Sequence, residues 1–177
     1  MKRLFVSIDI PENLKNDILK IQKELKHFQG KLTELENLHL TLKFLGETDN
    51  LNEINVINRL SKINFNSFKT NFKNIGVFSE QEIRIVWIHL TNCEELQKRV
   101  DEALEPLYPP EKRFMSHLTI ARVKRVFNKE LFLNELSKIE IPDLSFEVTN
   151  FRLKESKLTP NGPKYKTVKQ FNLIQQK

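Results

Sequence analysis

The first thirty residues pass from one hydrophobic period to another. Apolar and polar positions alternate in residues 3–10, as in a strand with one buried face. From residue 12 to residue 28, apolar side chains instead recur every three or four positions between lysines, which predicts a helix, and Gly30 follows as a stop signal. The chain is therefore expected to begin with a strand followed directly by a helix.

Both patterns recur along the rest of the sequence. Alternation predicts a final strand pair around residues 159–165 and further strands in the segments 37–46, 65–78, 82–90, 116–123 and 144–153. Helical spacing predicts helices in the segments 49–63, 92–107 and 128–137. Asp49 or Asn50 is expected to cap the first of these helices, and Asn92 with Glu95 to form a capping box for the second.

Two of these strands contain the same phrase, His-Leu-Thr followed by an aliphatic residue. The first copy starts at His39 and the second at His117. Each half of the chain combines strands and helices around one copy, which indicates a duplication and an α+β fold of two related lobes that face each other. Because no Gly/Ser-rich linker separates the halves, residues 1–177 are expected to form a single domain made of two intertwined lobes.

Composition narrows the functional classes. The formal net charge of +6 suits a polyanionic partner such as RNA, and it equally suits a lysine-rich solvated surface. Cys93 is the only cysteine, which excludes an intramolecular disulfide and favours a cytoplasmic, reducing location. No segment is apolar over the length of a membrane span, and the short apolar run at the start is closed by Pro11, so neither membrane insertion nor export is expected.

The repeated phrase places reactive groups on one side of each strand. Alternate side chains of a strand share a face, so His39 lies beside Thr41, and His117 lies beside Thr119. If the lobes bring these faces together, one imidazole can accept a proton from an attacking hydroxyl or water while the other donates a proton to a leaving oxygen. The threonine hydroxyls can donate hydrogen bonds to phosphate oxygens. This set predicts phosphoryl chemistry without a metal.

Two basic residues follow the threonines. Regular alternation puts Lys43 on the same face as His39, where it would be a cation at the edge of the cleft. Arg122 could make a bidentate contact to phosphate, but regular alternation points it away from His117. Its contribution therefore requires a bulge or the end of the strand.

Other readings of the histidines are weaker. A single His-x-Thr would most simply be a pair of strand residues without a functional role. The second copy at a corresponding position is what favours a function. Paired histidines also bind metals, but zinc normally takes three or four protein ligands and no carboxylate lies at ligand spacing. We expect no metal and no cofactor.

On these residues the sequence resembles the two-histidine (2H) phosphoesterase superfamily, and within it the bacterial and archaeal RNA 2',3'-cyclic phosphodiesterases, also called 2'-5' RNA ligases. The two family signatures are matched by ENLHLTLKFLGE and FMSHLTIARVK. The resemblance covers nearly the whole chain, and it includes RLFVSIDIPENL, IGVFSEQEIRIVWIHL and SKLTPNGPKYKTVKQFNL.

The resemblance implies a bilobed, pseudo-twofold fold in which two antiparallel sheets face a central cleft with helices outside. It implies hydrolysis of a terminal RNA 2',3'-cyclic phosphate to a 2'-phosphate without a metal, and 2'-5' ligation in reverse. His39 and His117 would be catalytic, with His39 as the acid and His117 as the base. Thr41, Thr119 and Arg122 would bind the substrate.

Two other functions stay open at this point. A nucleotide- or RNA-binding module would use the same cleft without turnover, and a hydrolase of a small cyclic nucleotide would share the mechanism but change the partner. The expected partner is an RNA with a 2',3'-cyclic phosphate end or a small nucleotide, and the expected state is a monomer. Residues of the cleft wall would decide among substrates, and the candidates are Phe5, Lys43, Phe78 and Arg122.

Overall fold

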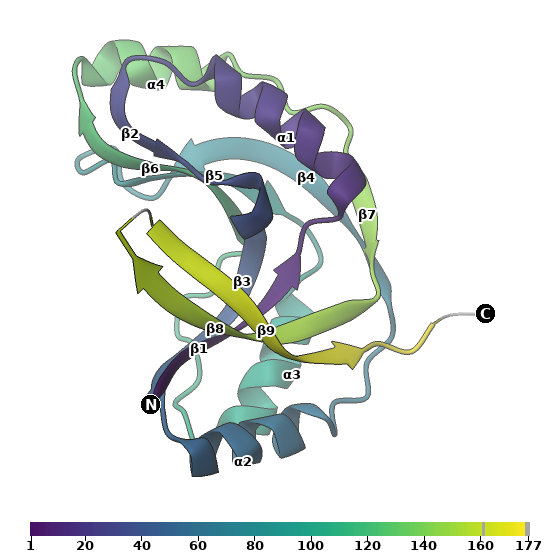
Figure 1. Cartoon of the computed structure of the whole chain (residues 1–177). Coiled ribbons are helices and arrows are strands. Elements are labelled where there is room, and N and C mark those ends of the chain that lie inside the picture. The colour runs from purple at the N-terminus through teal and green to yellow at the C-terminus, as the bar shows by residue number, and fades with distance from the viewer. Residues whose placement is uncertain (161, 176–177) are drawn as a thin grey trace.

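The strands form one strongly curled antiparallel sheet in the computed structural model, which describes residues 1–160 and 162–175 (Figure 1). The strand order is β7-β4-β5-β6-β3-β1-β8-β9, and β2 pairs with β6 beside this path. The strands are β1 (Lys2–Asp9), β2 (Phe28–Leu32), β3 (His39–Thr48), β4 (Phe68–Val77), β5 (Ile85–Leu90), β6 (His117–Val126), β7 (Ser145–Val148), β8 (Asn150–Thr159) and β9 (Gly162–Asn172).

Helices cover the outside of both halves of the sheet. They are α1 (Glu12–Glu24), α2 (Asn50–Leu60), α3 (Glu94–Leu104) and α4 (Lys129–Ser137), with a 3-10 turn at Leu35–Asn37. In Figure 1, α1 and α4 lie over the half that contains β4, β5 and β6, whereas α2 and α3 lie at the other half, near β1 and β3. Among the described residues, no helix has the length and apolar character needed to cross a bilayer.

The two halves meet at the two strands that carry the repeated phrase. β3 and β6 are joined by one residue pair, Leu40 opposite Leu118, and the strands on either side continue outward as β1, β8 and β9 or as β5, β4 and β7. The two predicted sheets are therefore continuous through this one pair. The predicted α+β fold class is confirmed.

Each half also supplies a helix that contacts the repeated strand of the other half. α1 follows β1 in the first half, yet Gln22 donates hydrogen bonds from its side-chain amide to the carbonyls of Thr33 and Ile120, both at 2.8 Å. α3 follows β5 in the second half, yet its Asp101 forms a buried ion pair with Lys43 of β3. These exchanged contacts fix β3 and β6 relative to each other.

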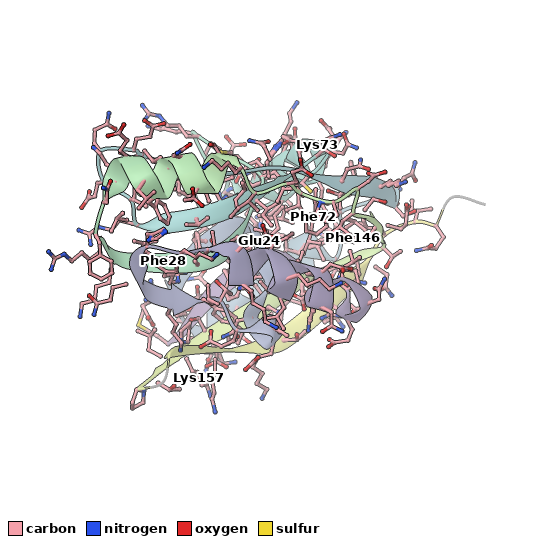
Figure 2. The ribbon with its side chains drawn as sticks, turned by 90° about the horizontal axis from the view of Figure 1, so that it is seen from above. Glu24, Phe28, Phe72, Lys73, Phe146 and Lys157 are labelled. Atoms are coloured by element: carbon pink, nitrogen blue, oxygen red, sulfur yellow. The ribbon has the colours of Figure 1, made fainter. Side chains whose placement is uncertain are left out.

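Aromatic side chains pack between the sheet and the helices. Figure 2 shows Phe72 of β4 and Phe146 of β7 close together beside α1, with ring centroids 6.1 Å apart. Phe28 contacts Phe132 of α4 with centroids 6.1 Å apart. The sequence has thirteen phenylalanines, while only 39% of its residues are hydrophobic. Most of these phenylalanines are large core residues, and a few are exposed.

The prediction of a helix that runs to residue 28 was wrong. α1 ends at Glu24, and His27 then adopts a left-handed backbone with φ 63°, which turns the chain into β2. Gly30 lies within β2 rather than after a helix. A Cβ added at Gly30 would overlap the carbonyl oxygen of Arg122, so this glycine allows β2 to approach β6 closely.

Two further local predictions have different outcomes. Asp49 caps α2 as expected, because its carboxylate accepts a hydrogen bond from the backbone of Asn52 at 2.8 Å. The capping box at α3 was wrong: Asn92 has φ 65°, and its side chain donates to the Lys69 carbonyl at 2.9 Å instead of capping the helix. The tertiary contact to β4 thus outweighs the local cap.

Candidate active site

The pair Leu40–Leu118 brings both copies of the phrase to one place. Residues directly opposite each other in an antiparallel pair point to the same face, and both leucines are buried in the core. Their neighbours on each strand therefore point to the opposite face. We name this surface the histidine face, and it carries His39, Thr41, His117 and Thr119.

Both strands contain a bulge just after the threonine. In the pairing of β1 with β3, Ser7 lies opposite Thr41 and Val6 lies opposite Lys43, so Leu42 is skipped. In the pairing of β5 with β6, Trp87 lies opposite Thr119 and Val86 lies opposite Ala121, so Ile120 is skipped. The burial patterns of the two strands agree over their first seven residues, which extends the duplication to the backbone geometry.

The bulge brings Arg122 to the histidine face. Because one residue is skipped, the side chains after the bulge change faces. Arg122 therefore points to the same face as His117 and Thr119. A phosphate contact by Arg122 requires such a bulge, because regular alternation would point the side chain away from His117. At the corresponding position of β3 the residue is Phe44, which is 70% exposed.

The same bulge overturns the prediction for Lys43. It turns Lys43 into the core, where the side chain is 3% exposed, pairs with Asp101 and donates to the Pro109 carbonyl at 2.7 Å. Burial alone would raise the pKa of Asp101, but hydrogen bonds from Lys43, the Glu111 backbone and Gln97 hold it below its usual range. Lys43 therefore ties β3 to α3 and does not line the histidine face.

Each histidine is held in one tautomer by its own chain. The Nδ1 atom of His39 lies 2.7 Å from the Asn37 carbonyl oxygen, and that of His117 lies 2.7 Å from the Met115 carbonyl oxygen. Because a carbonyl oxygen only accepts, Nδ1 carries the proton in both rings. In each ring, Nε2 is left to exchange a proton, and that of His39 lies 3.1 Å from the Thr41 hydroxyl.

Burial favours the neutral form of both imidazoles by lowering their pKa values. Burial lowers the pKa of His39 to about 4, although its hydrogen bond to the Asn37 carbonyl acts in the opposite direction. Burial also lowers the pKa of His117 against the effect of the Met115 carbonyl. The Arg122 guanidinium lowers both pKa values further, so this one cation acts on both histidines.

Aromatic side chains pack against both imidazoles. Phe5 and Tyr165 each lie 5.0 Å from the His39 ring, measured between centroids, and Phe78 lies 4.8 Å from the His117 ring. Phe5 is 3% exposed, so its ring packs against His39 inside the protein. Phe78 is 52% exposed, so part of its ring is accessible to a ligand. Of these two predicted wall residues, only Phe78 has a surface that a substrate could touch.

Charged side chains also surround His39. Asp9 lies opposite His39 in the pairing of β1 with β3, and it forms ion pairs with Arg152 and Lys154 of β8. The positive charge of Lys154 lowers the pKa of His39, and the negative charge of Asp9 raises it. Within residues 1–160 and 162–175, no group of three or more His, Cys, Asp or Glu side chains is arranged to hold a metal ion.

Three further residues of this face were not predicted from the sequence. Phe44 and Asp9 are brought there by strand register, and Tyr165 is brought there by the β8–β9 hairpin. The expected hairpin around residues 159–165 was correct, although Asn161 lies outside the described residues. Alternation places a side chain on a face but does not show which distant strand it will meet, so no local signal singles out Tyr165.

Comparison with known proteins shows which family this chain resembles. A family model described as "LigT like Phosphoesterase" matches residues 8–87 and 90–165. A Methanocaldococcus jannaschii protein named RNA 2',3'-cyclic phosphodiesterase is 40% identical over 174 residues, which cover 96% of this chain and 99% of the relative.

Solved structures share the fold at lower identity. A Thermus thermophilus protein superposes with a TM-score of 0.83 at 24% identity, covering 99% of this chain and 100% of its own. Escherichia coli LigT without ligand gives a TM-score of 0.78 at 23% identity, covering 98% of each chain. By the family match and the identity to its curated relative, the chain belongs to the LigT-like phosphoesterase family, whose 2H name refers to two histidines.

Proposed function

We propose that this protein is an RNA 2',3'-cyclic phosphodiesterase that opens the terminal cyclic phosphate to a 2'-phosphate by acid-base catalysis with His39 and His117. The observation that carries the proposal is the pair of imidazoles on one face, each with Nδ1 fixed by a carbonyl and Nε2 left for proton transfer. The name of the Methanocaldococcus jannaschii relative supports the substrate class.

The reaction needs one base and one acid. Water attacks phosphorus while the base takes its proton, the bond between phosphorus and the 3' oxygen breaks, and the acid gives a proton to that oxygen. The product is a 2'-phosphate beside a free 3'-hydroxyl. Two histidines in opposite protonation states supply both groups, and after one turnover a proton must pass back between them or through solvent.

The other residues of the histidine face are suited to hold the phosphate. In the free protein the Thr41 hydroxyl donates to Nε2 of His39, and rotation of this hydroxyl toward a phosphate oxygen would free Nε2 for the reaction. Thr119 has the corresponding position beside His117. Arg122 brings a cation that already acts on both rings, so it can stabilise the charge that develops on the phosphate oxygens.

The family resemblance makes His39 the acid and His117 the base. Because burial lowers the pKa of both rings, protonation of the acid must be favoured by the substrate, and the negative phosphate does this by stabilising an imidazolium. Attack by the 5'-hydroxyl of a second RNA, in place of water, would form a 2'-5' linkage at the same site. Water is present at far higher concentration, so hydrolysis is the dominant direction.

The pH dependence of kcat/KM follows from the lowered pKa values. The reactive form has one protonated and one neutral histidine, and above both pKa values its population falls about tenfold per pH unit. Since burial lowers both pKa values below the ordinary 6.5, the optimum of kcat/KM is expected below pH 6.5, with an alkaline limb at higher pH. The value of kcat should begin to fall at a higher pH than kcat/KM does, because bound phosphate raises the pKa of the acid. A kcat/KM that increases between pH 6.5 and 8 would contradict this account.

Substrate length separates the proposal from its alternatives. Rates are compared for a mononucleotide 2',3'-cyclic phosphate and for an oligonucleotide with the same terminal residue. A higher kcat/KM on the oligonucleotide supports an RNA end as substrate, and a higher value on the mononucleotide favours a hydrolase of small cyclic nucleotides. Binding without any product from either would indicate a binding module. Salt-dependent affinity is expected in all three cases and does not discriminate.

A further inference from the structure

Gln22 is a polar residue on the buried face of α1. The other buried residues of this helix are apolar and follow helical spacing: Leu14, Ile18 and Ile21. Gln22 is 1% exposed, and a side-chain amide in such a place destabilises the fold unless it is hydrogen-bonded. Its Nε2 atom donates to the carbonyl oxygens of Thr33 and Ile120, each at 2.8 Å. The amide therefore joins α1 to β6 and to the segment that follows β2.

Ile120 is the residue that the bulge of β6 skips in its pairing with β5. A bulge residue has no partner of its own in the ladder to the neighbouring strand, so its backbone groups need other partners. The Ile120 carbonyl has two, the backbone N–H of Thr33 at 2.9 Å and the Gln22 amide at 2.8 Å. Gln22 thus contacts β6 at the residue after which the side chains change faces.

The corresponding bulge of β3 is held by a different contact. Lys43 follows the skipped Leu42, and its ammonium pairs with Asp101 of α3. The residue at the corresponding position of β6 is the buried Ala121, whose methyl group can make no such bond. Each bulge is therefore contacted by the helix of the other half, through a side chain in β3 and through a backbone carbonyl in β6.

We propose that Gln22 is a positioning residue that holds the bulge of β6 in place and so keeps the Arg122 guanidinium on the histidine face. The inference rests on the proposed function, because that function assigns Arg122 to the substrate phosphate. With regular pairing in place of the bulge, the side chains after Ile120 would exchange faces, and Arg122 would point away from the site. His117 and Thr119 precede the bulge, so their directions do not depend on it.

The test is a double-mutant cycle with inorganic phosphate as the probe. Gln22→Met keeps a similar length and removes both hydrogen bonds, so fewer molecules hold Arg122 in place and phosphate should bind about 5- to 10-fold more weakly. In an Arg122→Ala background, the same change should alter phosphate affinity less than about twofold, because the guanidinium is already absent. Thr70→Val is the matched control, since it removes another hydrogen bond from a buried side chain to a carbonyl, that of Thr91 at 2.7 Å, and it should leave affinity unchanged.

NMR titration of His117 gives a signature that a loss of stability alone does not produce. The Arg122 guanidinium lowers the pKa of His117, so Gln22→Met and Arg122→Ala should both raise this pKa, and Thr70→Val should not. If Gln22→Met does not fold, Gln22→Asn takes its place in both experiments. Asparagine keeps the amide but is one methylene shorter, so the same results are expected.

The proposal is overturned if the folded Gln22 variant binds phosphate like the wild type, if its effect is equal in the Arg122→Ala background, or if the His117 titration is unchanged. Failure of the wild type to hydrolyse any 2',3'-cyclic end would refute the proposed function instead. The phosphate cycle and the titration would still decide the role of Gln22.

Discussion

Replacing His39 or His117 by alanine is expected to lower kcat for hydrolysis of an RNA 2',3'-cyclic end by about 10²- to 10⁴-fold for each residue. In the proposed mechanism each ring supplies one of the two proton transfers, and Thr41 or Thr119 cannot replace it because a hydroxyl does not titrate near neutral pH. The two losses should not add in the double variant, because the two groups act in one step. Single-turnover rates measured with saturating enzyme isolate this effect from binding.

A matched control comes from a histidine outside the site. His27 lies between α1 and β2 with a left-handed backbone, so His27→Asn removes an imidazole while keeping a residue that tolerates this conformation. It should retain wild-type turnover. Thermal unfolding of all variants shows whether they are folded. Wild-type rates in folded His39→Ala or His117→Ala protein would exclude the two-histidine mechanism.

Breaking the buried ion pair between Lys43 and Asp101 is expected to have the largest effect on stability. Lys43→Ala or Asp101→Ala leaves its partner buried without a counter-charge, which typically costs about 3–5 kcal/mol of unfolding free energy. Replacing both residues by apolar ones, as in Lys43→Met with Asp101→Leu, should cost less than either single change. Urea denaturation at pH 7 measures all three.

An exposed pair serves as the control for this experiment. Arg99 and Glu95 of α3 are 50% and 55% exposed, so Glu95→Ala should cost less than about 1 kcal/mol. The pH dependence gives a second check: the pKa of Asp101 is lowered on folding, so its contribution is present above the unfolded pKa and is lost as pH falls through the folded one. Equal losses for the buried and exposed pairs would contradict the structural role of Lys43.

The hydrophobic pattern of the sequence predicts where the helices and strands lie better than it predicts which face each side chain points to. Periodicity and turn residues are local properties, and they placed the strands that carry the repeated phrase, the strands β4 and β5, and α4. They did not reveal β2, because a five-residue edge segment stabilised by pairing with β6 has no strong pattern of its own. Its close approach depends on Gly30, whose role is visible only from the partner strand.

The candidate site was predicted as far as strict alternation holds. His39, Thr41, His117 and Thr119 precede the bulges, and the structure brings all four to one face through the pair Leu40–Leu118. Beyond Leu42 and Ile120 the parity changes, which reverses the expected directions of the residues that follow, Lys43 and Arg122. A bulge is set by pairing with a neighbouring strand and by contacts such as that of Gln22 with the Ile120 carbonyl, so the sequence of one strand does not show it.

The central claim is tested most directly by the product formed in the absence of free metal. Purified protein is incubated with EDTA and a short RNA that ends in a 2',3'-cyclic phosphate, beside the His39→Ala and His117→Ala variants, and the 2'- and 3'-phosphate products are separated. The account predicts a 2'-phosphate from the wild type alone. A 3'-phosphate, a requirement for added metal, or equal product from the variants would contradict it.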